Sequence, residues 1–439
     1  MLKLLHQHKD TILKYLICAV LMVVPLYPKF PFFKIPGIYV AIRLEDFLIV
    51  IVGLIFLFLF ACKWKEILSG KIERAIVIFL AVGLISLVGG IFLSKTATAH
   101  IAVLHWLRRI EYLLMFFIGS LFMKYGQGQK SLEFILKTLM LVVVVLFIYG
   151  LGQRYLTWPV IITQNEEYSK GIALRWVPGS HINSTFAGHY DLATFLVLLL
   201  PVFINCLILL KGKATKISLL AVILAGLWLL VNAVSRISIV SYLLGASFGL
   251  LLARKARFIP LVILVSLVFF AFSSDLLARY TRIFEVYGQE SKRTLEPQPE
   301  PVFEDRSTSI RLNVEWPRAV RAFVKSPLIG TGYSSISLAT DNDYLRLLGE
   351  TGILGFTSFL LILFRVGKSL WIKIKANVFQ NNIEKAVIAG LTGGMIGVLV
   401  NACFIDVFEA SKFALIFWLL IGYSVYLVKR NNNEQKIYP

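Results

Sequence analysis

The sequence is poor in charged residues: only 16% of its 439 residues are Asp, Glu, Lys or Arg, whereas 58% are hydrophobic. A soluble domain cannot bury that much apolar surface, but a lipid bilayer accepts it. The apolar runs also lack the strict polar–apolar alternation that strands of a membrane barrel require. Because backbone groups in lipid must be bonded within their own segment, the runs predict transmembrane helices in an all-α, polytopic membrane protein.

Cysteine is scarce as well. The four cysteines all lie inside apolar runs and have no paired spacing: Cys18, Cys62, Cys206 and Cys403. They are therefore interpreted as small apolar core residues rather than a disulfide or metal site. Neither a His/Cys cluster typical of zinc nor a clear acidic pair for magnesium is found, so no metal and no cofactor is expected.

Acidic residues are few relative to basic ones, 25 against 45, which gives a formal charge of +20. Most of the cations are dispersed at the ends of apolar runs and do not form one basic face. The positive-inside rule accounts for many of them, and an anionic lipid-linked substrate would account for others. Nucleic acid is therefore not expected as a partner.

About twelve apolar runs have nearly the length that crosses ~30 Å of hydrocarbon. They cover roughly residues 11–28, 42–62, 74–93, 101–123, 134–153, 187–210, 216–233, 236–253, 258–273, 350–367, 386–405 and 410–428. The first run ends without a small-residue cleavage site and is interpreted as a spanning helix, not a secretion signal.

This pattern divides the chain into three parts. Residues 1–273 hold helices 1–9 with a smaller outer loop at about 154–186, residues 274–349 form a large outer loop, and residues 350–439 hold helices 10–12 and a tail. The short connections rich in Lys and Arg all fall on one side, which the positive-inside rule assigns to the cytoplasm together with both termini. Both outer loops then face the periplasm or cell exterior.

Several ionisable residues interrupt the apolar runs, and mutual pairing near the membrane surface is the expectation for most of them: Arg43, Glu45, Asp46, Arg108, Arg109 and Glu111. Arg236, where the seventh run meets the eighth, is different, since its neighbours Ser235 and Ser238 are polar too. A charge at membrane depth usually lines a polar cavity or reaches the surface. For Arg236 both interpretations stay open.

The smaller outer loop carries two candidates. Arg175 lies beside a Pro-Gly turn, where a surface charge is the simpler interpretation and a ligand the alternative. His189 lies at the mouth of the sixth run. It is either a satisfied interfacial histidine or a proton carrier.

The large outer loop ends in an amphipathic helix predicted from STSIRLNVEW onward, with Ser and Thr as caps. Its apolar positions are 310, 314, 317, 320 and 324, and its opposite face carries Arg311, Glu315, Arg318 and Lys325. Such a helix is typical of the membrane surface. Pro317 either kinks it or marks its true first turn.

Directly after a glycine turn come DNDYLRLLGETG and the tenth apolar run. Asp341, Asn342 and Asp343 are thereby expected at the outer membrane boundary, facing the arginines of the helix. Tyr344 follows them.

Three segments of the chain together resemble the O-antigen ligase and O-antigen polymerase superfamily. They are SRISIVSYLLG at 235–245, IRLNVEWPRAVRAFVKSPLIGTGY at 310–333 and DNDYLRLLGETGILGF at 341–356. The number of runs, the late large outer loop and RWVPGS…GHYDLATFLVLLLP are similar as well. The resemblance covers the chain by layout and is sharp from about Arg175 to Phe356.

The resemblance implies transfer of a glycan from an undecaprenyl-pyrophosphate donor, on the outer face of the bacterial inner membrane, without a nucleotide sugar or metal. The essential arginines of the superfamily match Arg236 and Arg311, with Arg175 a third. Where the ligases have a histidine this chain has Asp341, which is similar to the polymerases. The implied function is polymerisation of lipid-linked repeat units, with a glycan acceptor and the bilayer as partners and a chain-length regulator left open.

This class also fits the chemistry of the residues. A pyrophosphate leaving group concentrates negative charge, which fixed guanidiniums stabilise. That role is predicted for Arg236 and Arg311, assisted by Arg175 or Arg318. The acceptor hydroxyl needs positioning and a base. The candidate base is Asp341, followed by Glu315 and then Asp343, while Asn342 and Tyr344 would hold sugar hydroxyls or orient the loop.

Two alternatives remain. A ligase would move a finished glycan onto lipid A-core or another acceptor. A transporter or flippase would also use many spans and intramembrane arginines, but its site would lie between internal repeats near the midplane, and no convincing repeat is found.

Overall fold

The computed structural model describes residues 9–28, 31–34, 41–60, 63–125, 129–161, 174–177, 180–271, 309–336 and 339–437. Nearly all of them are helical, which confirms the predicted class. The helices are α2 (Lys9–Leu26), α3 (Leu44–Phe60), α4 (Trp64–Ile67), α5 (Lys71–Val88), α6 (Ala99–Tyr125), α7 (Gln129–Tyr155), α9 (His189–Leu209), α10 (Lys213–Asn232), α11 (Arg236–Leu252), α12 (Ile259–Ala271), α15 (Trp316–Lys325), α16 (Asp343–Ala376), α17 (Asn382–Asn401) and α18 (Ser411–Ile437).

Short irregular elements complete the described fold. They are the π-helical turns η2 (Gly89–Leu93) and η4 (Arg311–Glu315), the 3₁₀ turn η3 (Ala256–Phe258), and the strands β1 (Pro31–Lys34) and β2 (Ala41–Arg43). The two strands pair antiparallel and were not expected from the sequence. The pair is too short to change the fold class.

Each of the twelve predicted apolar runs contains a helix, and the chain is a multi-pass helical membrane protein. Within the described residues, seven helices are long and apolar enough to cross a bilayer: Lys71–Leu93, Lys130–Tyr155, His189–Leu209, Lys213–Asn232, Asp343–Ala376, Asn382–Asn401 and Ser411–Lys429. α3 and α11, with 17 residues each, and α12, with 13, are too short to meet this length. α6 is long enough but carries charged residues in its middle. The expected number of twelve spans is therefore not confirmed.

α9, α17 and α18 form the interior of the bundle, whereas α5 and α10 expose many apolar side chains on its outside. α11 packs very closely on α17. A Cβ atom added at Gly393 would lie 2.3 Å from the carbonyl oxygen of Gly245. Small residues that let backbones approach in this way are typical of membrane helix pairs.

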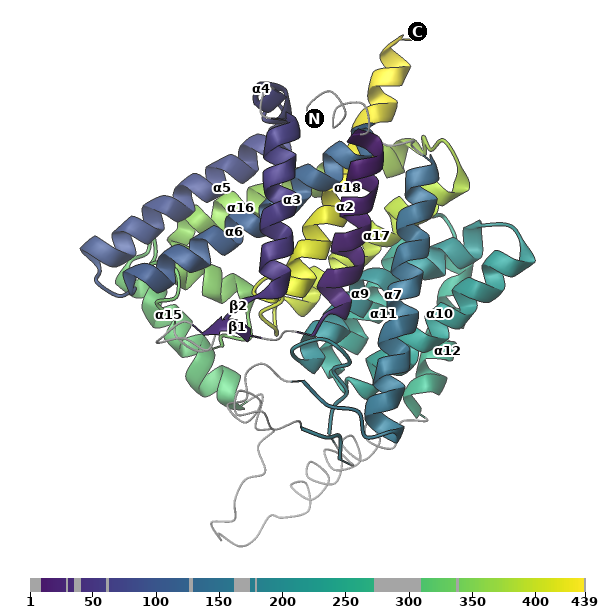
Figure 1. Cartoon of the computed structure of the whole chain (residues 1–439), viewed down its shortest axis with the longest axis horizontal. Helices are drawn as coiled ribbons and strands as arrows, with labels where there is room; N and C mark the ends of the chain where they lie inside the picture. The colour runs from purple at the N-terminus through teal and green to yellow at the C-terminus, as the bar shows by residue number, and fades with distance from the viewer. Residues whose placement is uncertain are drawn as a thin grey trace, which may run out of the picture.

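One end of the bundle holds the cationic connections. Figure 1 shows α4, the start of α2 and the end of α18 at the same end of the molecule. Lys429 forms an ion pair with Glu73, and Arg365 donates a hydrogen bond to the backbone of Lys71. These contacts bring together three of the cationic connections that the sequence predicts on one side of the membrane, and the cytoplasmic assignment of that side stays a prediction.

The opposite end holds η4, α15, the N-termini of α9, α11 and α16, and the C-terminus of α17 (Figure 1). We call it the polar end. α16 begins at Asp343, inside the predicted outer loop, because Asn342 caps it: its Oδ1 accepts a hydrogen bond from the N–H of Leu345 at 3.0 Å. At Gly352 the helix is interrupted by a φ of +65°, a conformation that favours glycine.

The amphipathic helix forms as η4 followed by α15, with Pro317 in the first turn of α15, where its missing N–H costs little. Its apolar residues Ile310, Val314, Val320 and Val324 are exposed. Its polar face carries half-buried Arg311, Glu315 and Arg318, and the buried Ala319 follows directly. The polar face therefore turns toward the protein and the apolar face away from it, as expected for a helix bordering lipid.

Candidate functional site

The best-defined contact at the polar end joins η4 to the turn before α16. Arg311 donates two hydrogen bonds to Oδ2 of Asp341, from Nε at 3.0 Å and from Nη2 at 2.8 Å. Asp341 has a φ of +49°, which is uncommon for a residue other than glycine. Burial raises the pKa of Asp341, opposed by Arg311 and reinforced by Asp406. Sequence reasoning predicted this pair correctly as neighbours.

Arg311 also reaches the start of α9. Burial acts to lower the pKa of Arg311, but Asp341 and a hydrogen bond with Tyr190 act in the other direction and the net shift is upward. The ring of Tyr190 lies 4.0 Å from that of His189, which in turn stacks on His181 at 4.0 Å. His189 is thus one neighbour removed from Arg311.

Glu315 lies one turn after Arg311. Its Oε2 is buried and has no hydrogen-bond partner among the residues that the structure describes. Burial raises the pKa of Glu315 to about 7, and the negative charges of Asp341 and Asp406 act in the same direction, while Arg311 and Arg318 oppose them. Such a carboxyl group changes protonation near neutral pH, as a general base must. Arg318 likewise has a buried Nη1 without a partner in the described part of the chain.

Asp406, in the connection between α17 and α18, is the main residue that sequence reasoning missed. Its Oδ2 accepts a hydrogen bond from the N–H of Thr340 at 2.9 Å, and its Oδ1 from the N–H of Asn342 at 3.0 Å. Arg346 donates to its Oδ2 at 3.1 Å. The signal in the sequence is an acidic residue between two apolar runs, in CFIDVFEAS, and a single carboxylate there does not by itself indicate a site.

Three predicted substrate-binding residues have partners within the protein. Asn342 caps α16. The buried Asp343 accepts hydrogen bonds from the N–H groups of Val407 and Phe408, at 2.7 and 3.1 Å. The hydroxyl of Tyr344 donates to the carbonyl of Leu399 at 2.8 Å. Tyr344 thus fixes the start of α16 to the end of α17, and Asp343 fixes it to the connection that follows α17. Contact with substrate stays a prediction for all three residues.

Arg236 is the first residue of α11 and is half-buried at the polar end. Ser238, in the same turn, donates to Oδ1 of Asn401 at 3.2 Å, and Nδ2 of Asn401 donates to Thr194 of α9 at 2.7 Å. Arg236 is therefore linked to the Tyr190–Arg311 group through α17 and α9. α11 begins at the polar end, where η4 also lies (Figure 1), and a ligand shared by Arg236 and Arg311 stays a prediction.

Arg175 has an exposed side chain, and its Nη1 donates to the carbonyl of Thr157 at 2.6 Å. No contact within the described residues joins it to Arg311. Its predicted role as a third donor-binding arginine remains a prediction.

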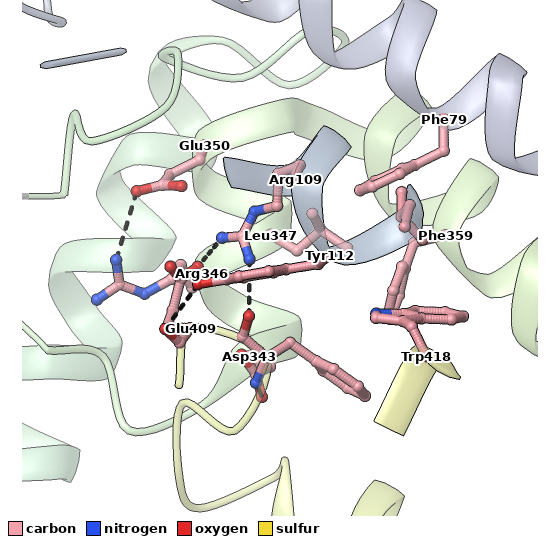
Figure 2. A pocket seen from close by; sticks show the side chains of 12 residues that line it. Phe79, Arg109, Tyr112, Asp343, Arg346, Leu347, Glu350, Phe359, Glu409 and Trp418 are labelled. Carbon is pink, nitrogen blue, oxygen red and sulfur yellow. Dashed lines mark hydrogen bonds and ion pairs between the residues drawn. The ribbon is translucent and has the colours of Figure 1, made fainter. Parts of the chain in front are cut away.

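A second group of charges, which includes Arg109, Arg346, Glu350 and Glu409, lines a small cavity (Figure 2). Arg109 pairs with Glu409 and donates to the carbonyl of Phe408 at 2.9 Å. Arg346 lies 3.6 Å from the buried Glu350. The mutual pairing expected for the charges within the apolar runs is not found for Arg109, because Glu409, in the connection between α17 and α18, is its partner.

The other charged residues within the apolar runs lie close to one another, as expected. Arg43 lies 3.8 Å from Glu45, and its backbone N–H donates to Asp46 at 3.0 Å. Arg108 and Glu111 interact electrostatically with this group. In the described parts of the chain, no three His, Cys, Asp or Glu side chains are grouped to hold a metal ion.

Residues 219–360, which include Arg236, Arg311, Glu315 and Asp341, match the family model described as O-antigen ligase. This stretch is therefore similar to the O-antigen ligase family. The match confirms the resemblance to the O-antigen ligase and polymerase superfamily over this stretch, and members of that family are glycosyltransferase-like enzymes. No curated protein matches the chain.

Proposed function

We propose that the chain polymerises undecaprenyl-pyrophosphate-linked oligosaccharide repeat units, transferring the lipid-linked glycan to a sugar hydroxyl of the acceptor. The observation that carries the proposal is the arrangement of Arg311, Asp341 and Glu315 at the polar end, inside the domain that matches the O-antigen ligase family. In this account, twelve helices span the bacterial inner membrane and the polar end faces the periplasm or cell exterior.

Arg311 and Arg236 bind the donor diphosphate. A guanidinium presents several donors in a plane and keeps its charge at any physiological pH, so it stabilises the charge that develops on the leaving group. Arg318, with an unoccupied buried donor, assists from the next turn of the same helix. Arg175, His189 and its neighbour Tyr190 extend the site toward the glycan.

Glu315 acts as the base, and Asp341 orients Arg311. Asp341 already accepts two hydrogen bonds from Arg311, whereas Glu315 has a free oxygen in the described structure and a pKa of about 7. Glu315 takes the proton of the acceptor hydroxyl as its oxygen bonds to the anomeric carbon. The bond from that carbon to the diphosphate oxygen breaks, and undecaprenyl pyrophosphate leaves with the electron pair. Attack opposite the leaving group inverts the anomeric centre.

Asn342, Asp343 and Tyr344 serve this site by holding the turn that presents Asp341. The exposed apolar face of η4 and α15 borders the acyl chains of the outer leaflet. A donor whose prenyl chain stays in the bilayer then presents its diphosphate to the polar face of the same helix.

A ligase is the second candidate, because the matching family model carries that description. Polymerase is preferred on Asp341, which stands where the resembling ligases have histidine. A polymerase would have a chain-length regulator as a further partner.

The test is to incubate the purified protein with a native undecaprenyl-linked repeat unit, alone or with lipid A-core, and to size the products on a gel. A ladder from the repeat unit alone supports polymerase, and product only with lipid A-core supports ligase. NMR of the product linkage, compared with the donor, tests inversion. Flux of the lipid-linked glycan across liposomes that survives Arg311→Ala, without any product, would instead favour a transporter.

A further inference from the structure

The connection between α17 and α18 contacts the elements that carry the proposed donor-binding residues. It begins at Asn401, the last residue of α17, and includes Asp406. Both residues lie at the polar end, and neither was a candidate from the sequence. Their contacts run in two directions, toward α9 and α11 on one side and toward the turn before α16 on the other.

Asn401 fixes the N-terminus of α11 to that of α9. Its side chain is fully buried and bonds Thr194 through Nδ2 and Ser238 through Oδ1, at 2.7 and 3.2 Å. Ser238 belongs to the turn that Arg236 begins, and Thr194 donates at 2.8 Å to the carbonyl of Tyr190. One amide therefore sets the spacing between the Arg236 turn and the Tyr190 turn.

Asp406 fixes the turn that carries Asp341. Its two oxygens accept the N–H groups on either side of Asp341, those of Thr340 and Asn342, at 2.9 and 3.0 Å. Asp341 itself has a positive φ, which costs free energy unless the surroundings compensate. An asparagine at position 406 could not replace these bonds, because an amide has one acceptor oxygen and its nitrogen only donates.

We propose that Asn401 and Asp406 are positioning residues that hold Arg236 and the Arg311–Asp341 pair in register, so that both guanidiniums meet one diphosphate. The inference rests on the proposed function, since it takes the donor diphosphate as the shared ligand. The connection between α17 and α18 thus sets the relative position of the two arginines, although none of its own groups takes part in the transfer reaction. A displacement of about 1 Å in such a site can cost about 100-fold in rate.

Asp406 also has an electrostatic effect that distinguishes positioning from mere stability. The charged groups that act on Glu315 are Asp341, Asp406, Arg311 and Arg318, and the charge of Asp406 contributes to its raised pKa. Removal of that charge lowers the pKa of Glu315. The acid limb of the pH–rate profile then moves to lower pH, a change that a loss of stability alone does not produce.

The experiment compares Asp406→Asn, Asp406→Glu and the matched control Glu409→Gln in the purified full chain with the undecaprenyl-linked repeat unit. Glu409 lies on the same connection but pairs with Arg109. Asp406→Asn is expected to lower kcat by about 10- to 100-fold and to shift the acid limb downward. Asp406→Glu keeps the negative charge, so the midpoint of the acid limb should stay unchanged while kcat falls. Glu409→Gln leaves the midpoint unchanged.

Asn401→Ala supplies a second, independent measurement. With Asn401 replaced, the Arg236 turn loses its register, so adding Arg236→Ala should cost less than it does in the wild-type chain. If the wild-type protein is active and Asp406→Asn shows the wild-type rate and the wild-type midpoint of the pH–rate profile, this inference alone is overturned. If Asp406→Asn does not fold, the same result in Asp406→Glu overturns it. Wild-type protein with no transfer activity overturns the proposed function and this inference with it.

Discussion

Arg311 binds Asp341 through two nitrogen atoms and one carboxylate oxygen, across 30 residues of chain. The side chains remain partly accessible, 13% for Arg311 and 25% for Asp341. An incoming diphosphate can therefore reach the guanidinium, which keeps donors beyond the two that Asp341 uses. The pair thus combines a fixed orientation with free binding capacity.

Replacement of Arg311 by Ala should lower transfer by about 100-fold or more, because the leaving-group charge loses a fixed donor. Arg311→Lys should recover only part of the rate, since an ammonium group cannot form the planar, two-nitrogen contact. The assay is product formation from the lipid-linked repeat unit. The matched control is Arg321→Ala, an exposed arginine of the same helix. Equal losses in both variants would count against a specific role for Arg311.

Glu315→Gln should lower kcat by about 100-fold or more, within the range that general bases contribute. In the wild type, burial together with Asp341 and Asp406 raises the pKa of Glu315 to about 7, so the rate should rise with pH through about 7 and then level off. The variant should lose this rise. A pH–rate profile that keeps the same acid limb in Glu315→Gln would show that another group is the base.

Asp341→Asn tests the division of roles between the two carboxyl groups. We expect a lower kcat because Arg311 is less well oriented, and an acid limb displaced to lower pH because Glu315 loses a negative neighbour. The measurement is again kcat against pH. If the acid limb disappears in this variant, Asp341 is the base and Glu315 is not.

Arg236 and Arg311 should act on one ligand, although they belong to separate elements. In a double-mutant cycle of Arg236→Ala and Arg311→Ala, the losses in kcat/KM should be strongly non-additive, because either change alone already disrupts the shared diphosphate site. The variants should still insert into the membrane, which is measured as the yield of folded protein in detergent. Independent, additive losses would place the two arginines in different sites.

The outward face of α15 should border lipid. Val324 is 69% exposed on that face, so Val324→Asp should lower activity in proteoliposomes by placing a charge against acyl chains. Val324→Leu is the control and should keep wild-type activity. Wild-type activity of Val324→Asp in proteoliposomes would indicate that this face is in water.

Much of the fold followed from composition and periodicity. Every predicted apolar run holds a helix, and of the two alternatives left open for Pro317, a kink or a first turn, the structure shows the first turn of α15. The start of α16 was set too late, because the run was traced by hydropathy and the cap at Asn342 lies in a polar segment. The number of spans was not confirmed, since length and apolar content alone do not assign the shorter helices.

The site was predictable only in part. Arg311 and Asp341 were recognised in the segments that resemble the superfamily, and Glu315 on the polar face of the predicted amphipathic helix. Asp406 was not, because its role depends on tertiary contacts with Thr340 and Asn342 in another part of the chain. The ranking of the bases also changed with the structure, since sequence cannot show that Asp341 accepts two hydrogen bonds from Arg311 while Oε2 of Glu315 is buried without a hydrogen-bond partner among the described residues.

The central claim is that Arg236 and Arg311 hold one lipid diphosphate at the polar end. The most direct measurement is an electron cryomicroscopy structure of the protein in nanodiscs with undecaprenyl pyrophosphate bound. The account predicts diphosphate oxygens within hydrogen-bond distance of both guanidiniums, with the prenyl chain along the bilayer. A diphosphate bound away from both arginines, or at the opposite end of the bundle, would contradict it.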